Sequence, residues 1–466
     1  MQSVHAVLAD LWAQAGGKSF SLEAVKLTGV EPSVPSSFRV ATAAQASIAA
    51  TGLAAAEIAR LRGGRAQTVS VDMLHAAIEC RSERYLTVDD KPPPPAWDAI
   101  AGVYKTGDGR FVRLHTNFPH HRDNICNLLG CAPERDAVQA ALMKWKGEAF
   151  ETAAYAGGCV VSLMRSRQEW LAHPQAKALK ALPVITIERI GEAAPRAWPA
   201  GERPLSGLRV LDLSRVIAGP VAGRALAAHG ADVMLVTGPT LPSIPWLVID
   251  TGRGKLSCSL DLKNDEGRAS LRKLMSNADI MVQGYRPQAL AKLGFSPQDA
   301  ALLNPGIVYV SLCAYGHVGP WAERRGFDSL VQTSTGFNHA EAQAAGIESG
   351  PKELPMQILD HVTGYLMAFG AMMARARQAH EGGSWHVRVS LAQTGQWLWN
   401  LGRLPKGLET PDIAADAVTP FIEESDSGFG RLRAVRHAAV LSRTPAMWSR
   451  PSVPLGHDAP EWPPRG

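Results

Sequence analysis

Long apolar runs are missing from this sequence. No run of about 18 apolar residues is present, so a membrane-spanning helix is not expected. The opening stretch MQSVHAVLADLWAQAGGK lacks the basic-then-apolar pattern of a secretory signal. Cysteine is scarce, with six scattered residues among 466, which excludes a disulfide scaffold and fits a reducing compartment. These absences predict a cytoplasmic protein that makes no membrane contact.

Charge is sparse as well. Charged residues make up 20% of the chain, and the formal net charge of +5 is spread out without any Lys/Arg block. Nucleic acid is therefore not an expected partner. The 46% of hydrophobic residues can form a large core, and the length suggests two or three domains.

Metal and dinucleotide motifs are also lacking. The strand–turn–helix–strand unit at residues 209–236 has no GxGxxG, so an NAD or FAD site is poorly supported. Five residues in the first half of the chain could bind a metal: His115, His120, His121, Cys126 and Cys131. Their spacing matches no zinc motif. Nothing in the sequence pairs any of the three histidines with a particular thiol for catalysis. We therefore expect no metal site.

Apolar segments alternate with helical ones from Leu208 onward. The expected strands are LRVLDL, ADVMLV, DIMVQG and IVYVSLC, and the expected helices are VAGRALAAHG, DEGRASLRKLMSNA and RPQALAKLG. Apolar runs separated by helical periods are typical of a parallel sheet covered on both faces. The predicted fold class is α/β, with a Rossmann-like parallel-sheet large domain and a smaller α+β domain.

An internal repeat accompanies this pattern. Residues 51–74 and 365–394 each read as an Ala-rich helix, a Gly-Gly stop and a strand ending in Val-Ser. Superimposing the two helices places Gln45 where Asp360 stands in the second copy.

Four regions are predicted from composition and pattern. The small domain includes a hairpin closed at Gly107-Asp108-Gly109 and followed by a helix. The regions are a truncated scaffold copy with the Ala-rich helix (1–95), the small α+β domain (96–200), the Rossmann-like domain with a second Ala-rich helix (201–400) and an extended C-terminal return (401–466).

Asp360 opens the otherwise apolar stretch ILDHVTGYLMAFGAMMARA. An acidic residue in the first turn of a helix complements the helix dipole and needs no catalytic role. The same helix terminus is expected to keep the carboxylate ionised, and an ionised aspartate in an apolar site is a competent nucleophile toward an acyl group. Both interpretations can hold together.

Arg253 and Lys255 lie in the glycine-rich turn of DTGRGKLSCSLDLK. A cationic turn before a strand suits an anionic ligand, although the segment is not a Walker A loop. Ligand binding and a purely structural turn remain open here.

Four segments in this order carry a family resemblance: LSGLRVLDLSRVIAGPVAGRALAAHGADVMLV, SLDLKNDEGRASLRKLMSNADIMVQGYRPQALAKLGF, LNPGIVYVSLCAYGHVGPWAERRGFDSLVQTSTG and the Asp360 helix. They closely resemble the class III CoA-transferase family, which includes formyl-CoA transferase, carnitine CoA-transferases and 2-methylacyl-CoA racemases. The match covers residues 205–394, with a weaker likeness over residues 40–197. The resemblance implies a Rossmann-like CoA-binding domain, a smaller domain and a homodimer, commonly interlocked.

The resemblance also implies the site. The catalytic residue of the family falls on Asp360. An acyl-CoA thioester would be the substrate, a free carboxylic acid the acceptor, and no cofactor would be bound permanently. The implied CoA contacts are Arg215, Ile217, Leu260, Lys263, Gly284, Tyr285, Lys292 and Arg325.

Several departures from the family pattern bear on function. Phe327 stands before Asp328 where racemases have a histidine, which argues against racemisation. The segment at 237–255 is shortened, so Arg253 and Lys255 are candidates to rebuild its CoA contacts. The small domain precedes the Rossmann-like part, which suggests a fusion in which each copy keeps what the other has lost.

The expected reaction is CoA transfer through a covalent aspartyl-CoA thioester on Asp360. Two alternatives stay open: a catalytically silent CoA-binding protein, and an acyl-CoA isomerase that works by intramolecular CoA transfer.

Overall fold

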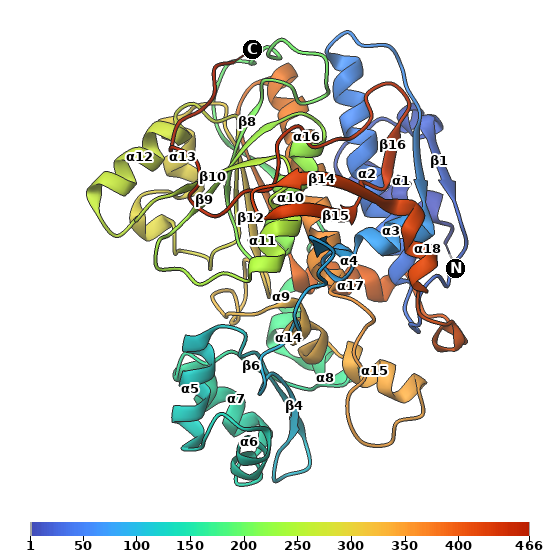
Figure 1. The fold of residues 1–466 in the computed structure, drawn as a ribbon, viewed down its shortest axis with the longest axis vertical. Coiled ribbons are helices and arrows are strands. Elements are labelled where there is room, and N and C mark those ends of the chain that lie inside the picture. The colour runs from blue at the N-terminus through green and yellow to red at the C-terminus, as the bar shows by residue number, and fades with distance from the viewer. Residues whose placement is uncertain (1, 466) are drawn as a thin grey trace.

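Residues 2–465 are described by the computed structural model of the protein. Within them, the strands form one sheet of seven strands and three sheets of three strands. Figure 1 shows the large sheet beside the N-terminal helices, with a small domain projecting away from both. Within the same residues, no helix combines the length and the apolar character that crossing a bilayer requires.

The large sheet has the strand order β10-β9-β8-β11-β12-β13-β7. All neighbours are parallel except β13 and β7. The six parallel strands thus have the 3-2-1-4-5-6 order of dinucleotide-binding folds, which confirms the predicted α/β class. The strands are β7 (Thr186–Gly191), β8 (Arg209–Leu213), β9 (Asp232–Thr237), β10 (Lys255–Ser259), β11 (Ile280–Gln283), β12 (Val308–Cys313) and β13 (Ser384–Ser390).

Helices cover both faces of this sheet (Figure 1), so its central strands are buried and apolar. The helices and the 3₁₀ turn that come between and after the strands β8 to β13 are α10 (Ala218–Ala228), α11 (Pro245–Thr251), α12 (Asp265–Met275), η2 (Ala291–Leu293), α13 (Pro297–Leu303), α14 (Asp328–Ser334), α15 (Phe337–Ala344), α16 (Ile358–Glu381) and α17 (Leu391–Asn400). Of these, α14 and α15 lie toward the small domain and not on the sheet.

The prediction of a helix over RPQALAKLG is wrong, because this segment contains only the short 3₁₀ turn η2. Pro287 disfavours a helical conformation at the residue before it. Gln288 has a positive φ of 69°, which is incompatible with a right-handed helix. The segment therefore turns back tightly after β11.

The N-terminal region forms a second helix–strand unit beside the first. Its elements are α1 (Val4–Gln14), η1 (Ser19–Ala24), β1 (Val25–Thr28), α2 (Val40–Leu61), β2 (Val69–Asp72), α3 (Met73–Glu79), α4 (Ser82–Tyr85) and β3 (Thr87–Val88). Strand β2 has β1 as a parallel neighbour and β16 (Ala439–Leu441) as an antiparallel one. Strand β13 likewise has the parallel neighbour β12 and the antiparallel neighbour β7. The units α2–β2 and α16–β13 thus share a topology, and their two helices pack together.

The small domain has its own sheet and core. The predicted hairpin is confirmed, because β4 and β5 pair antiparallel around Gly107-Asp108-Gly109 and α5 follows. Its elements, with the helices that lead back to the large sheet, are β4 (Gly102–Lys105), β5 (Phe111–Leu114), α5 (Pro119–Leu129), α6 (Arg135–Leu142), α7 (Gly147–Ala156), β6 (Val161–Leu163), α8 (Arg167–Ala172) and α9 (Pro174–Leu179).

The C-terminal segment returns along the molecule. Its elements are η3 (Gly407–Glu409), α18 (Ala415–Val418), η4 (Thr419–Phe421), β14 (Ile422–Ser427), β15 (Gly430–Val435) and β16. Strand β15 pairs with both β14 and the early strand β3, so distant parts of the chain share one sheet. Residues 442–465 contain no helix or strand and run past β10, where the Asp458 N–H donates to the Ser257 carbonyl.

Candidate active site

Asp360 lies in the first turn of α16, as the sequence predicts, and its side chain is only 7% exposed. Two cavities reach it. Val216, Ile217 and Phe327 line both cavities along with Asp360. The carboxylate therefore stands where the two spaces meet.

The two cavities differ in chemistry. The first, about 360 Å³, is lined by four arginines and is called the cationic cavity: Arg215, Arg286, Arg324 and Arg325. The second, about 490 Å³, is lined mainly by apolar residues of the segment 93–97 and of α11 with the loop before it, and is called the apolar cavity. An anionic ligand fits the first and an apolar group fits the second.

Asp328 fixes the start of the Asp360 helix. Its Oδ2 accepts a hydrogen bond from the backbone N–H of Asp360 at 2.9 Å, and it is fully buried on α14. The Gln332 side chain donates to the other oxygen of Asp328 and also to the Met356 carbonyl. Asp328 therefore acts as the acceptor for a helix N-terminus that has no side-chain cap of its own.

A third carboxylate, Glu83 on α4, lines the apolar cavity with Asp360. The His361 Nε2 lies 3.1 Å from Glu83 Oε2. Burial alone would raise the pKa of Glu83, but the hydrogen bond and charge of His361, together with Arg84, lower it overall. Glu83 thus brings a negative charge close to Asp360.

Asp360 itself has a pKa raised well above its ordinary value. Burial is the main cause, followed by the negative charges of Asp328 and then Glu83. The pKa of Asp328 is also raised, to about 6, mainly by burial. The expectation that the helix terminus keeps Asp360 ionised is therefore wrong, because desolvation and two like charges outweigh the helix dipole. Once ionised, such a carboxylate is a stronger nucleophile than an ordinary one.

The N-terminus of α10 approaches this carboxylate closely. A Cβ at Gly364, one turn after Asp360, would lie 2.5 Å from the Ala218 carbonyl oxygen, so only glycine allows this approach. Val216, just before α10, has a φ of 73°, a strained value for a β-branched residue. The N-terminus of α10 has no side-chain cap, and Ala218 in its first turn lines the cationic cavity together with Asp360.

The predicted contact residues Arg215, Ile217, Gly284, Tyr285 and Arg325 all line the cationic cavity. Arg215 and Ile217 follow β8, and Gly284 and Tyr285 follow β11. Strands β8 and β11 are the neighbours at which the strand order of the sheet reverses. Ligands of such sheets bind in the crevice outside the carboxyl ends of these strands.

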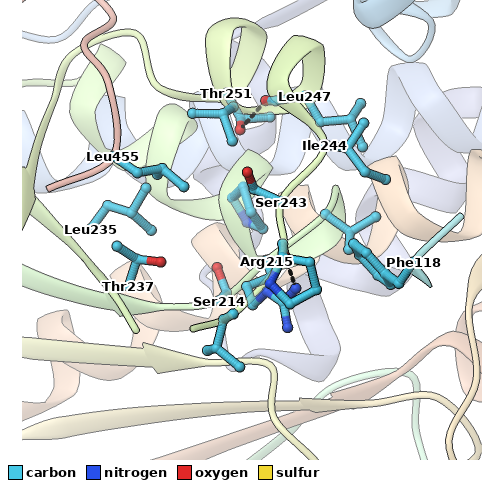
Figure 2. Close-up of a pocket in the computed structure, with 15 residues that line it drawn as sticks. Phe118, Ser214, Arg215, Leu235, Thr237, Ser243, Ile244, Leu247, Thr251 and Leu455 are labelled. Carbon is cyan, nitrogen blue, oxygen red and sulfur yellow. Dashed lines mark hydrogen bonds between the residues drawn. The ribbon is translucent and has the colours of Figure 1, made fainter. Parts of the chain in front are cut away.

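Arg215 is held by the shortened segment. Its guanidinium donates to the Pro242 carbonyl and lies 5.1 Å from the centre of the Phe118 ring. Figure 2 shows Arg215 and Phe118 at a pocket of about 40 Å³ that adjoins the cationic cavity. The segment 238–251 therefore covers the ends of β8 and β9 and orients this arginine.

Arg253 and Lys255 lie elsewhere, and neither lines these cavities. Both are buried: the Lys255 ammonium lies 2.8 Å from Asp212, and the Arg253 guanidinium lies 3.0 Å from Asp250. Their charges already have protein partners, which argues against direct contact with a CoA phosphate. The Lys255 partner comes from β8, so the sequence does not reveal it, whereas Asp250 stands only three residues before Arg253 in the quoted segment.

The remaining predicted contacts lie outside the cavities. Leu260 packs in the core beneath β10. Lys263 and Lys292 are exposed. Since Lys263 follows β10 and Lys292 follows β11, both lie toward the carboxyl edge of the sheet, where an extended ligand leaving the cationic cavity would pass.

The histidines considered as metal ligands gather at the cavities instead. His115 stacks on Phe327 with a centroid distance of 3.8 Å, and His120 and His121 line the cationic cavity. Residues 2–465 contain no group of three or more His, Cys, Asp or Glu side chains placed to hold a metal ion.

Comparisons with known proteins identify the family of the chain. The model of CoA-transferase family III matches residues 10–199 and 205–402. The chain belongs to CoA-transferase family III. It is therefore an enzyme of the acyl-CoA transferase kind.

Two curated relatives match most of the chain. An acyl-CoA transferase of Gibberella moniliformis is 28% identical over 80% of this chain and 74% of its own length. The acetyl-coenzyme A transferase nodX of Hypoxylon pulicicidum is 29% identical over 79% of this chain and 70% of its own. A solved structure, that of Rv3272 from Mycobacterium tuberculosis, is 30% identical with a TM-score of 0.40, over 44% of this chain and 58% of the other.

Proposed function

We propose that the protein moves CoA between an acyl-CoA thioester and a free carboxylic acid, with Asp360 as the nucleophile. One observation carries the proposal: Asp360 stands at the junction of a cationic and an apolar cavity. The CoA part of a thioester would enter from the cationic side and the acyl part would occupy the apolar side. The reacting carbonyl would then lie at the carboxylate.

The first half of the reaction loads CoA onto the protein. An oxygen of Asp360 attacks the thioester carbonyl, the C–S bond breaks, and a mixed anhydride and a CoA thiolate form. The thiolate then attacks the aspartyl carbonyl of the anhydride, releases the donor acid as a carboxylate and leaves an aspartyl-CoA thioester. No proton is gained or lost overall.

The second half reverses these steps with the acceptor. The acceptor carboxylate attacks the aspartyl-CoA carbonyl and expels the CoA thiolate, which forms a second mixed anhydride. The thiolate attacks the acyl carbonyl of that anhydride, so the new acyl-CoA leaves and the Asp360 carboxylate is restored. Each step develops negative charge on a carbonyl oxygen, and the uncapped N–H groups that begin α10 are suited to stabilise it.

Trapping of the covalent intermediate tests the proposal. The protein is incubated with a panel of acyl-CoAs, treated with hydroxylamine or borohydride, digested and mapped by mass spectrometry. We expect modification at Asp360, its absence in Asp360→Asn and its retention in the matched surface variant Asp426→Asn. CoA binding without an adduct would favour a silent binding protein, and turnover with no acid present would favour an isomerase.

The architecture adds a second proposal. We propose that the chain fuses two complementary copies, divided near residues 95, 200 and 400. Gln45 takes the place of the carboxylate in the first copy, where its amide donates to the Thr28 and Val71 carbonyls. A Gln45→Asp variant with a single trapped adduct, still at Asp360, would support one site per chain.

Assembly and location remain proposals as well. The family resemblance predicts a homodimer of the interlocked kind common in the family, for which light scattering should give twice the mass of the chain. The expected cytoplasmic location is tested by fractionating cells that make the protein.

A further inference from the structure

The apolar cavity is large for the acyl group of a simple acid. Its volume of about 490 Å³ lies within the range of about 300–1,000 Å³ typical of pockets for drug-sized ligands. An acetyl or propionyl group would leave most of it unfilled. Unfilled apolar space gives up dispersion contacts, so the walls favour a bulky occupant.

Aromatic rings form much of the wall. Trp97, Trp246 and Phe327 all line the cavity. His115 is stacked on Phe327 and meets Trp97 edge-on at 6.1 Å and 81°. The Arg113 guanidinium lies over the Trp97 ring, 5.0 Å from its centre. Rings arranged in this way pair well with a further ring.

The wall is rigid as well as apolar. It includes Pro93, Pro94 and Pro95, within a run of four prolines that ends just before Ala96. Each pyrrolidine ring fixes φ near −65°, so little backbone freedom remains to be lost when a ligand binds. Trp97 follows directly and is 38% exposed, although most large apolar side chains of the protein are buried.

Charge in the cavity disfavours a second acid group. Glu83 and Asp360 both line it, and Arg84 is the one Lys or Arg side chain among the described lining residues. Arg84 already lies 3.8 Å from Glu83, and its side chain is 43% exposed. Burial lowers the pKa of His115 to about 3, so its imidazole is neutral near pH 7. A dicarboxylic acyl group would therefore meet the negative charge of Glu83, and the described part of this wall offers no cation other than Arg84 to offset it.

We propose that the acyl group carried by this enzyme is a bulky, ring-bearing monocarboxylic one, and that Trp97 and Trp246 determine this specificity. The inference rests on the proposed function, because it assigns the apolar cavity to the acyl half of the thioester. Trp97 comes from the segment before β4 and Trp246 from α11, so two separate parts of the chain would contact the ring.

Identity exchange measures the specificity without knowledge of the natural acceptor. Each acyl-CoA is mixed with the deuterium-labelled form of its own acid, and label entering the thioester is followed by mass spectrometry. The probes are 2-naphthylacetyl-CoA, phenylacetyl-CoA, acetyl-CoA and succinyl-CoA. We expect kcat/KM for the two ring-bearing donors to exceed that for acetyl-CoA and succinyl-CoA by about 100-fold or more.

Tryptophan variants test whether Trp97 and Trp246 determine the preference for ring-bearing donors. Trp246→Ala and Trp97→Ala should each lower kcat/KM for 2-naphthylacetyl-CoA by about 10- to 100-fold and leave that for acetyl-CoA within about threefold. Trp246→Phe should restore most of the loss. Leu302→Ala, at an 82% exposed position of α13, is the control and should change neither value.

The possible failures are distinguishable. Exchange in which small or dicarboxylic acids are preferred, or in which both tryptophan variants keep the wild-type preference, overturns this inference and leaves the proposed function intact. If no acid exchanges, the proposed function fails. Calorimetry with 2-naphthylacetate then tests whether the apolar cavity binds a ring-bearing acid. Binding to the wild type that Trp246→Ala and Trp97→Ala lose supports the cavity assignment, and no binding overturns it.

Discussion

The Asp328 carboxylate accepts a hydrogen bond from the backbone N–H of Asp360 at 2.9 Å, so one buried acid positions the helix that presents another. The two aspartates come from α14 and α16, which are separated by α15 and a loop. The same contact that fixes the first turn of α16 also places a negative charge beside Asp360. Asp328 therefore influences both the position and the pKa of Asp360.

Loss of Asp328 should affect catalysis more than binding. Asp328→Ala removes a charged acceptor worth about 1.5–3 kcal/mol, which corresponds to a fall in kcat of about 10- to 100-fold. KM for the acyl-CoA should stay within about threefold, because Asp328 does not line either cavity. Steady-state kinetics test this, and an increase in KM with unchanged kcat would contradict a positioning role.

The pH profile should reveal the charge of Asp328 separately. In the proposed mechanism only ionised Asp360 attacks, so kcat/KM should rise with pH through its raised pKa. Asp328→Asn removes the neighbouring charge and should move this acidic limb to lower pH. An unchanged limb in Asp328→Asn would show that Asp328 does not influence the ionisation of Asp360.

Stability should depend on pH in the opposite sense. The pKa of Asp360 is higher in the folded than in the unfolded chain, so its contribution is fully present below its ordinary value of 3.8 and is lost as pH rises through the folded-state pKa. Asp360→Asn removes this loss. The variant should therefore have a higher Tm than the wild type at pH 8, and the difference should shrink toward pH 4 in scanning calorimetry. A difference that grows toward acidic pH would contradict the assigned direction of the shift.

Gly364 offers a test of the approach between α10 and α16. A Cβ there would meet the Ala218 carbonyl at 2.5 Å, so Gly364→Ala should cost about 1–3 kcal/mol in unfolding free energy and also lower kcat by displacing Asp360. Gly370→Ala is the matched control on the same helix, because its Cβ would meet the Val387 side chain away from the cavities. Chemical denaturation and kinetics together should show a stability loss for both variants and an activity loss for Gly364→Ala.

Lys255 should contribute to the stability of the fold and not to the binding of acyl-CoA. Lys255→Met leaves the buried Asp212 unpaired and should destabilise the fold by about 3–5 kcal/mol, with KM for the acyl-CoA unchanged. Adding Asp212→Leu should recover much of the stability. Arg325→Ala, in the cationic cavity, should instead raise KM about tenfold with little change in Tm. A large rise in KM for Lys255→Met would restore Lys255 as a ligand contact.

The sequence predicts the part of this site that follows from local pattern and sheet rules. Arg215 and Gly284 each follow an apolar run, and parallel strands bring such positions to one edge. Glu83 could not be predicted as a neighbour of Asp360, because 277 positions separate them and only the packing of the N-terminal unit brings them together. The sequence leaves two roles open for Lys255 for a related reason: its partner Asp212 lies on a strand separated from β10 by β9. The signal for the apolar cavity was visible in KPPPPAW, where a rigid run precedes an exposed tryptophan.

The pairing of β16 with β2 has a consequence for how the protein is made. Strand β2 ends at Asp72, and its antiparallel partner begins at Ala439. At a synthesis rate of about 5–20 residues per second, β16 is synthesised roughly 20–70 s after β2. During that time the edge of β2 is an unpaired template for other chains. A nascent chain that stalls before Ala439 should therefore engage chaperones or aggregate, even though all residues around Asp360 have already been synthesised.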